Sequence, residues 1–168
     1  MKKLLIIPTL LILGHFSLQA QSLVATAEKA QAKVMTTVKD DITLIEEAIT
    51  DYVMGLYQVD TTRIYRSVHP DLKKRGFWLP PDSKEFKGPY EMSFQQLVDL
   101  AASWNAKGDQ ANEDSPMVIK VLDVLDKTAS ARVNAAWGVD FFHLAKFDGK
   151  WLIMNVLWQS YPMKTNKK

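Results

Sequence analysis

The chain has 168 residues, no cysteine, and a formal net charge of +2. The lack of cysteine excludes disulfides, thiol nucleophiles and cysteine-ligated metal centres. So small a charge, without a long Lys/Arg stripe, predicts that the protein has no nucleic-acid partner. Beyond the first twenty residues the histidines are His69 and His143, which have no metal-ligand spacing, so we expect neither a metal nor another cofactor.

The first twenty residues have the three parts of a signal peptide. Lys2 and Lys3 supply the positive start, residues 4–13 form an apolar stretch, and Ala20 is the small residue before the predicted cleavage point. The apolar stretch is shorter than the ~20 residues of a membrane-spanning helix, although an uncleaved N-terminal anchor is the alternative. We therefore expect an exported protein, periplasmic or secreted, with no membrane attachment after cleavage.

The remaining chain has the length of one domain. Residues 21–39 are rich in Ala, Thr and Lys and predict a tail or a loosely docked segment. From Asp40 or Asp41, either of which can cap a helix, apolar residues recur at helical spacing and predict the first firm helix. The residues that set this spacing are Ile42, Ile45, Ile49, Tyr52 and Leu56.

A short second helix is predicted to begin at Thr61 or Thr62. It must end at His69, because Pro70 disfavours the α conformation for the residue before it. Residues 73–78 then have the pattern of a strand. The segment that follows, rich in Pro, Gly and charged residues, is expected to be a loop.

The second half of the chain changes from helix to strand. Ser93 and Gln96 have the spacing of a capping box and start an amphipathic helix. After it, the dipeptide Asp148-Gly149 predicts a two-residue hairpin turn. Four strands are expected, at residues 117–125, 128–137, 139–147 and 150–158. Helices followed by an antiparallel meander predict an α+β fold.

The last hairpin, VDFFHLAKFDGKWLIMNVLW (139–158), predicts which side chains share a face. In a register without a bulge, Asp140 and His143 point to opposite faces and cannot form a catalytic dyad. The face of Asp140 also carries Phe142, Leu144, Trp151, Ile153, Asn155 and Leu157. Both faces are largely apolar, so we expect the helices to cover one and a second copy of the chain to cover the other, as a homodimer.

Four segments in order along the chain resemble one family. They are ITDYVMGLYQVD (49–60), VHPDLKKRG (68–76), YEMS (90–93) and the hairpin at 139–158. They resemble the nuclear transport factor 2-like superfamily in its group named "putative lumazine-binding", related to SnoaL-like and ketosteroid-isomerase-like proteins. The resemblance implies one domain at residues 40–162, with a basic tail at 163–168. It also implies a cone: N-terminal helices packed on a curved antiparallel sheet, as in cystatin-like folds, with a pocket between them.

Relatives in this superfamily include enzymes and non-catalytic binding domains, so the fold does not select a function. Our first hypothesis is a small-molecule-binding or accessory domain that holds an apolar or aromatic molecule. The alternative is a ketosteroid-isomerase- or dehydratase-like enzyme with Asp140 or His69 as the acid or base. We favour the first because the polar residues are sparse and unpaired, and His69 could equally fix the helix end. The predicted pocket residues are Tyr52, Tyr57, His69, Trp78, Asp140, Phe142, Ile153 and Asn155.

Overall fold

A long N-terminal helix precedes the rest of the fold. The computed structural model describes the backbone of residues 12–161 and the side chains of residues 21–161; residues 1–11 of the predicted signal peptide and the predicted basic tail lie outside this part. Helix α1 spans Ile12–Tyr57. The chain divides into two compact units, Met1–Lys39 and Asp40–Lys168. None of the helices in the described part has the length and apolar character needed to cross a membrane.

The expected helix start at Asp40 or Asp41 is wrong, because α1 passes through both residues. Neither glycine nor proline interrupts the sequence between Ala20 and Gly55, and the segment is rich in good helix formers such as Ala, Lys and Glu. Residues 21–39 are helical and exposed throughout. Asp41 does not cap a helix; its buried carboxylate instead accepts hydrogen bonds from Lys146 and Trp151.

The second helix forms where the sequence predicts it. Helix α2 spans Thr61–Ser67, and the side chain of Asp60 caps it by accepting a hydrogen bond from the Thr62 amide. Strand β1, Val68–Trp78, follows directly and contains Pro70. The strand is longer than expected, because α2 already ends at Ser67, two residues before the predicted end at His69, and β1 begins at Val68.

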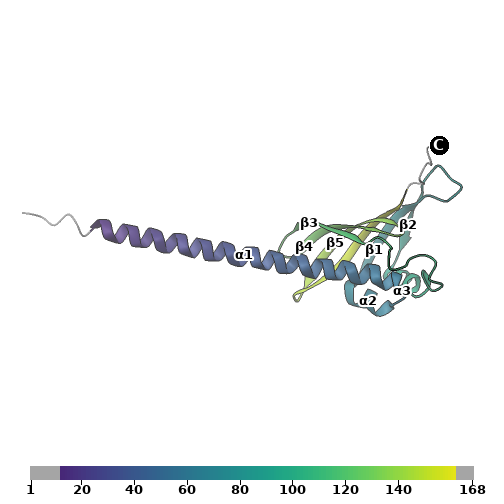
Figure 1. The fold of residues 1–168 in the computed structure, drawn as a ribbon, viewed down its shortest axis with the longest axis horizontal. Helices are drawn as coiled ribbons and strands as arrows, with labels where there is room; N and C mark the ends of the chain where they lie inside the picture. The colour runs from purple at the N-terminus through teal and green to yellow at the C-terminus, as the bar shows by residue number, and fades with distance from the viewer. Residues whose placement is uncertain (1–11, 162–168) are drawn as a thin grey trace, which may run out of the picture. The chain divides into compact units, whose positions relative to one another are not determined.

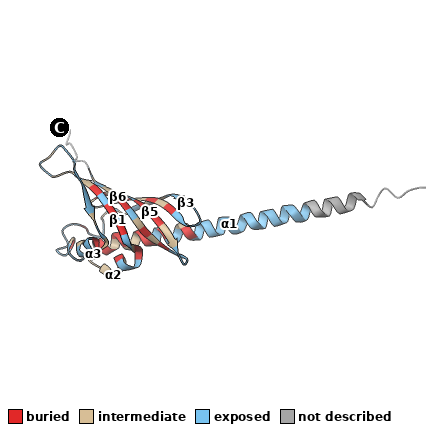
Figure 2. Ribbon diagram, turned by 180° about the vertical axis from the view of Figure 1, so that it is seen from behind, coloured by how far each residue is buried: buried red, intermediate tan, exposed pale blue. Residues whose placement is uncertain are grey.

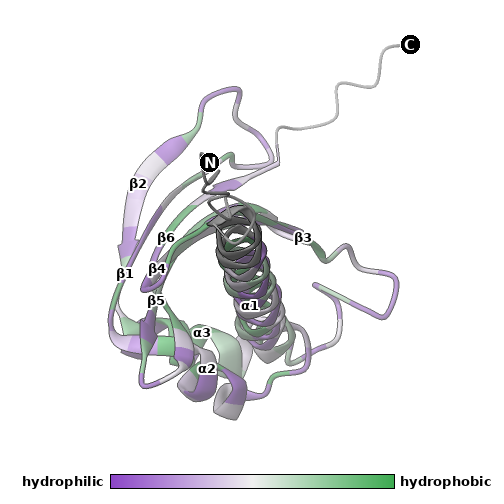
Figure 3. Ribbon diagram, turned by 90° about the vertical axis from the view of Figure 1, so that its left-hand side faces the viewer, coloured by the Kyte–Doolittle hydropathy of each residue, from purple (hydrophilic) through white to green (hydrophobic). Residues whose placement is uncertain are grey.

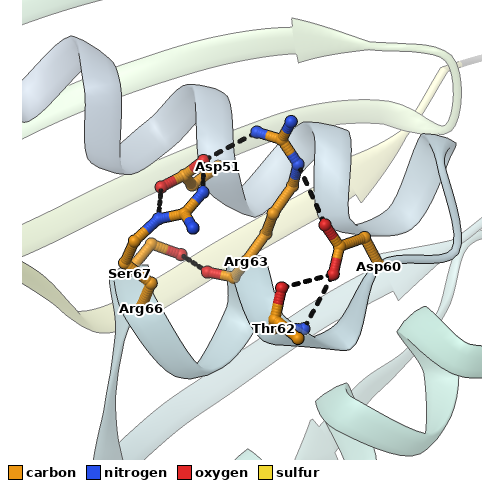
Figure 4. A network of polar contacts seen from close by, with 6 residues as sticks. All are labelled: Asp51, Asp60, Thr62, Arg63, Arg66 and Ser67. Carbon is orange, nitrogen blue, oxygen red and sulfur yellow. Dashed lines mark hydrogen bonds and ion pairs between the residues drawn. The ribbon is translucent and has the colours of Figure 1, made fainter.

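An ionic network joins α2 to the C-terminal part of α1 (Figure 4). The Asp51 carboxylate on α1 accepts two hydrogen bonds from Arg66, at 2.5 and 2.6 Å, and one from Arg63, at 2.8 Å. Arg63 also lies 3.4 Å from the capping carboxylate of Asp60. The network therefore ties α2 to the C-terminal part of α1.

Within residues 12–161, six strands form one sheet in the order β2-β1-β6-β5-β4-β3. The expectation of a purely antiparallel sheet is corrected, because β1 pairs in parallel with β6 and every other pair is antiparallel. Strand β2 was not predicted, because its residues are mostly exposed and carry no apolar alternation. The strands after β1 are β2 (Lys87–Met92), β3 (Val118–Val124), β4 (Thr128–Ala135), β5 (Gly138–Phe147) and β6 (Lys150–Ser160).

The core lies on the concave side of this sheet. The strands curve around residues 40–57 of α1, with α2 and α3 at one end (Figures 1 and 3). Helix α3, Phe94–Ser103, begins with the predicted capping box of Ser93 and Gln96. Buried and exposed residues alternate along the central strands (Figure 2). One apolar cluster includes Ile45, Ile49, Tyr52 and Val53 of α1, Leu97 of α3, and Val133, Phe142 and Ile153 of the sheet.

A β-bulge in β6 changes the predicted faces of the last hairpin. The turn is as expected, with positive φ at both Asp148 and Gly149. However, Leu144 pairs with Ile153 and His143 with Asn155, so one residue of β6 is unpaired between them. Beyond the bulge, each side chain of β6 therefore points to the face opposite to the one predicted from a regular register. The placement of Asn155 and Leu157 on the face of Asp140 is therefore wrong: both are exposed.

The same register confirms that Asp140 and His143 lie on opposite faces. Asp140 is fully buried on the concave side, and His143 is exposed on the convex side. Val156 and Trp158 replace Asn155 and Leu157 on the concave side.

Candidate functional site

A buried polar network lies at the centre of the concave face. The carboxylate of Asp140, on β5, has no solvent exposure and accepts three hydrogen bonds. Tyr52 of α1 donates to Oδ2 at 2.8 Å, Lys74 of β1 donates to the same oxygen at 3.2 Å, and Trp137 donates to Oδ1 at 2.7 Å. The Lys74 ammonium also donates to the Tyr52 hydroxyl at 2.5 Å. The network therefore links a helix, two strands and the β4–β5 connection.

Strand alternation explains why Lys74 is buried. Leu72, Lys74 and Gly76 of β1 point inward, whereas Lys73 and Arg75 point to solvent. The run Lys73-Lys74-Arg75 resembles a solvated charge cluster, but its middle residue is only 5% exposed. A buried ammonium needs a compensating charge, which Asp140 provides.

Burial perturbs the Tyr52 hydroxyl within this network. Desolvation and the negative charge of Asp140 hold the pKa of Tyr52 well above its usual value. The hydroxyl therefore keeps its proton over the physiological range and remains a donor to Asp140. It acts as a fixed bridge between the carboxylate and the ammonium.

A cavity of about 420 Å³ opens beside the network. Four of the five tryptophans line it: Trp78, Trp104, Trp137 and Trp158. Lys74 is the one charged side chain among the described residues of its wall, which also includes Leu56, Met92, Leu100, Gln110, Ala136 and Ser160. The volume lies in the range of small-molecule sites, about 300–1,000 Å³.

Ring contacts hold the aromatic wall in place. Trp104 and Trp137 meet edge to face at 5.3 Å between centroids, and Tyr57 stacks on Trp104 at 6.1 Å. The Tyr57 hydroxyl accepts from the Ala136 amide and donates to the Pro116 carbonyl, both at 2.7 Å. Burial raises the pKa of Tyr57, against the opposing effect of the Ala136 hydrogen bond. Tyr57 thus packs against Trp104 and Trp137 of the wall and is itself held by two hydrogen bonds.

The structure separates the predicted site residues into groups. Trp78 lines the cavity, and Tyr52, Tyr57 and Asp140 lie directly behind its wall. Phe142 and Ile153 are fully packed core residues. Lys74, Trp137 and Trp158 were missed. The alternation of β1 could have indicated Lys74, but the side of Trp158 depended on the bulge.

His69 and Asn155 lie away from this cavity. The His69 ring stacks on Phe147 at 4.9 Å, and its Nδ1 accepts a hydrogen bond from the Asp71 amide at 3.1 Å. Asn155 and His143 line a separate hollow of about 460 Å³ on the convex face. Within the described residues, no group of three or more His, Asp or Glu side chains could hold a metal ion.

Helices packed on a curved sheet, with an apolar cavity beside a buried polar network, define a cone-shaped α+β fold of the ligand-binding type. The chain belongs to the family described as "Putative lumazine-binding", which matches residues 40–159. The resemblance of the four sequence segments is thereby confirmed. A comparison with curated proteins finds no match.

Solved structures share the fold at low identity. An NTF2-like protein of unknown function from Shewanella baltica OS155 is 20% identical, with 73% of this chain and 95% of that chain covered and a TM-score of 0.57. Another, from Silicibacter pomeroyi DSS-3, is 15% identical over 74% and 98%, with a TM-score of 0.56. A "putative scytalone dehydratase" from Novosphingobium aromaticivorans DSM 12444 is 12% identical over 76% and 88%, with a TM-score of 0.52.

Proposed function

We propose that this protein is an exported binding domain whose cavity holds a flat, apolar or aromatic small molecule. The observation that carries the proposal is the cavity of about 420 Å³ with four tryptophans in its wall. Indole rings present broad apolar faces and lose little conformational entropy when they contact a ligand. A flat ring system can stack on one of them while the others exclude water.

Fluorescence titration tests this proposal directly. A naphthalene derivative added to the protein should quench or shift tryptophan emission with saturation at one site per chain. Trp78→Ala should weaken binding, because Trp78 lines the cavity and is 44% exposed. Phe147→Ala is the matched control, since Phe147 is 42% exposed but lies outside the cavity wall. Unsaturable quenching, or equal weakening by both variants, would refute a specific cavity site.

A role of Asp140 as a general base is the second candidate, and the geometry weighs against it. Its carboxylate is fully buried, accepts hydrogen bonds from three donors, and is absent from the cavity wall. A base must come within hydrogen-bonding distance of the proton it removes. We therefore assign Asp140 to positioning: it orients Lys74 and Trp137, which do line the cavity.

The proposal includes a homodimer formed through the convex face of the sheet. Phe141 is 48% and Leu157 54% exposed there, and both pair side by side across β5 and β6. Exposed apolar residues on a sheet favour burial against a partner. Light scattering should give twice the monomer mass, and Phe141→Glu with Leu157→Glu should halve it. A monomeric wild-type protein would contradict this part.

Export has its own test. The full chain expressed in a bacterium should be recovered from the periplasm or medium with Gln21 as its first residue, as N-terminal sequencing would show. An intact N-terminus in the cytoplasmic fraction would contradict export.

A further inference from the structure

The ammonium of Lys74 has more donors than its protein partners use. It carries three N–H bonds and no acceptor. One is directed to Tyr52 and one to Asp140. The ammonium also lies 5.6 Å from the ring centroid of Trp158, which forms part of the cavity wall. The third N–H is thus available at the surface of the cavity.

Ser160 and Gln110, two other polar residues of the wall, each have a hydrogen-bond partner. The Ser160 hydroxyl accepts a hydrogen bond from the Leu79 amide at 2.9 Å, and the Gln110 amide group donates to Asp109 at 3.1 Å. Lys74 differs from both because it is nearly fully buried and charged. A hydrogen bond that it donates would be charge-assisted and shielded from water, and such bonds are about twice as strong as neutral ones.

The charge balance of the site restricts the acceptor. Asp140 already compensates the positive charge of Lys74 at 3.2 Å. No second cation lies among the described residues of the wall. An anionic ligand would therefore add an unpaired charge to a buried site, against the negative faces of the indole rings. An uncharged carbonyl oxygen accepts the same hydrogen bond without that cost.

We infer that the cavity selects flat aromatic ligands that carry an uncharged carbonyl group, and that Lys74 recognises the carbonyl oxygen. This inference rests on the proposed function, since it names the ligand class of the same cavity. Asp140 and Tyr52 hold the ammonium in place but do not touch the ligand. The carbonyl end lies at Lys74, and the ring system lies among the tryptophans.

Three probes of nearly equal size test whether the cavity prefers a neutral carbonyl group, a hydrocarbon or an anion. They are 2-acetylnaphthalene, which has a neutral carbonyl; 2-isopropylnaphthalene, which has no acceptor; and 2-naphthoate, which is an anion. Equilibrium dialysis against the wild-type protein should rank 2-acetylnaphthalene first. Lys74→Met should reduce the affinity ratio of the ketone to the hydrocarbon by roughly tenfold to a hundredfold. The hydrocarbon itself should bind the variant as well as it binds the wild type.

Two further variants guard against a folding defect. Arg75→Met is the matched control, because Arg75 is the next residue of β1 and points to solvent; it should leave all three affinities unchanged. Lys74→Met combined with Asp140→Leu removes the buried pair as a unit and should show the same loss of ketone preference. This double variant keeps the test valid if the single variant unfolds.

These measurements distinguish a failure of the carbonyl inference from a failure of the proposed function. If 2-isopropylnaphthalene binds and Lys74→Met leaves the ketone preference unchanged, the carbonyl inference is overturned and the proposed cavity site stands. Tightest binding by 2-naphthoate would equally overturn it. If none of the probes binds the wild type, the proposed function itself fails.

Discussion

Replacing Asp140 by Asn should destabilise the protein severely. Asp140→Asn keeps the shape of the side chain but removes the charge that compensates Lys74. Both groups are buried, at 0% and 5% exposure, and Lys74 would retain only neutral acceptors, namely the Tyr52 hydroxyl and the amide oxygen of the introduced Asn. Removing one partner of a buried ion pair costs about 3–5 kcal/mol, because an uncompensated charge stays behind. That is a large part of the ~5–15 kcal/mol that stabilises a typical domain.

Urea denaturation at pH 7 measures this loss. The midpoint should fall while the slope of the transition stays constant, since the folded core keeps its size. Asp71→Asn is the control, because the Asp71 carboxylate is exposed and its loss should change the free energy of unfolding by less than about 0.5 kcal/mol. The double variant Lys74→Met/Asp140→Leu should recover most of the stability, since it leaves no buried charge. An unchanged midpoint for Asp140→Asn, or a double variant as unstable as the sum of its singles, would refute the electrostatic reasoning.

Three further predictions concern other parts of the fold. Gly76→Ala should weaken binding of the naphthalene probe and lower stability, because a Cβ there would lie 2.2 Å from the Trp158 ring; unchanged binding would contradict the close approach. Hydrogen bonds from Arg66 hold the pKa of Asp51 below its ordinary value, so this carboxylate stabilises the fold above about pH 4 and the contribution is lost as the pH falls further. Asp51→Asn should thus cost about 1 kcal/mol at pH 7 and less at pH 3 by urea unfolding, and an equal cost at both would refute the linkage. Val59 has φ of 58°, unfavourable for a β-branched residue, so Val59→Asn should raise stability by about 1 kcal/mol; a lower melting temperature would count against stored strain.

The local signals of the sequence were sufficient for most of the secondary structure. The capping box at Ser93 and the Asp148-Gly149 turn each act within a few residues, and both appear as expected. Helix α2 ends at Ser67, two residues before the end predicted from Pro70. The predicted start of α1 at Asp40 or Asp41 was wrong for a related reason. A capping residue marks a helix start only where the preceding segment resists helix formation, and residues 21–39 do not.

The candidate site depended on longer-range features. Asp140 and Tyr52 were predicted near one another, and the structure joins them by a 2.8 Å hydrogen bond. Lys74 was missed because it stands within the charged run Lys73-Lys74-Arg75, and because the parallel pairing of β1 with β6 brings together residues about 80 positions apart. The bulge in β6 likewise has no signal in the local sequence. It moved Trp158 into the cavity and Asn155 out of it, although the sequence of the hairpin reads as regular.

The position of β6 also determines when the chain can fold. This strand ends at Ser160, near the end of the sequence, yet it lies between β1 and β5 in the middle of the sheet. During synthesis, β1 and β2 have no partner in the rest of the sheet until the last strand leaves the ribosome. The contacts between β1 and β6 span most of the domain, and pairings of such high contact order form slowly. The sheet is therefore completed only after β6 has been synthesised, by a pairing that forms slowly.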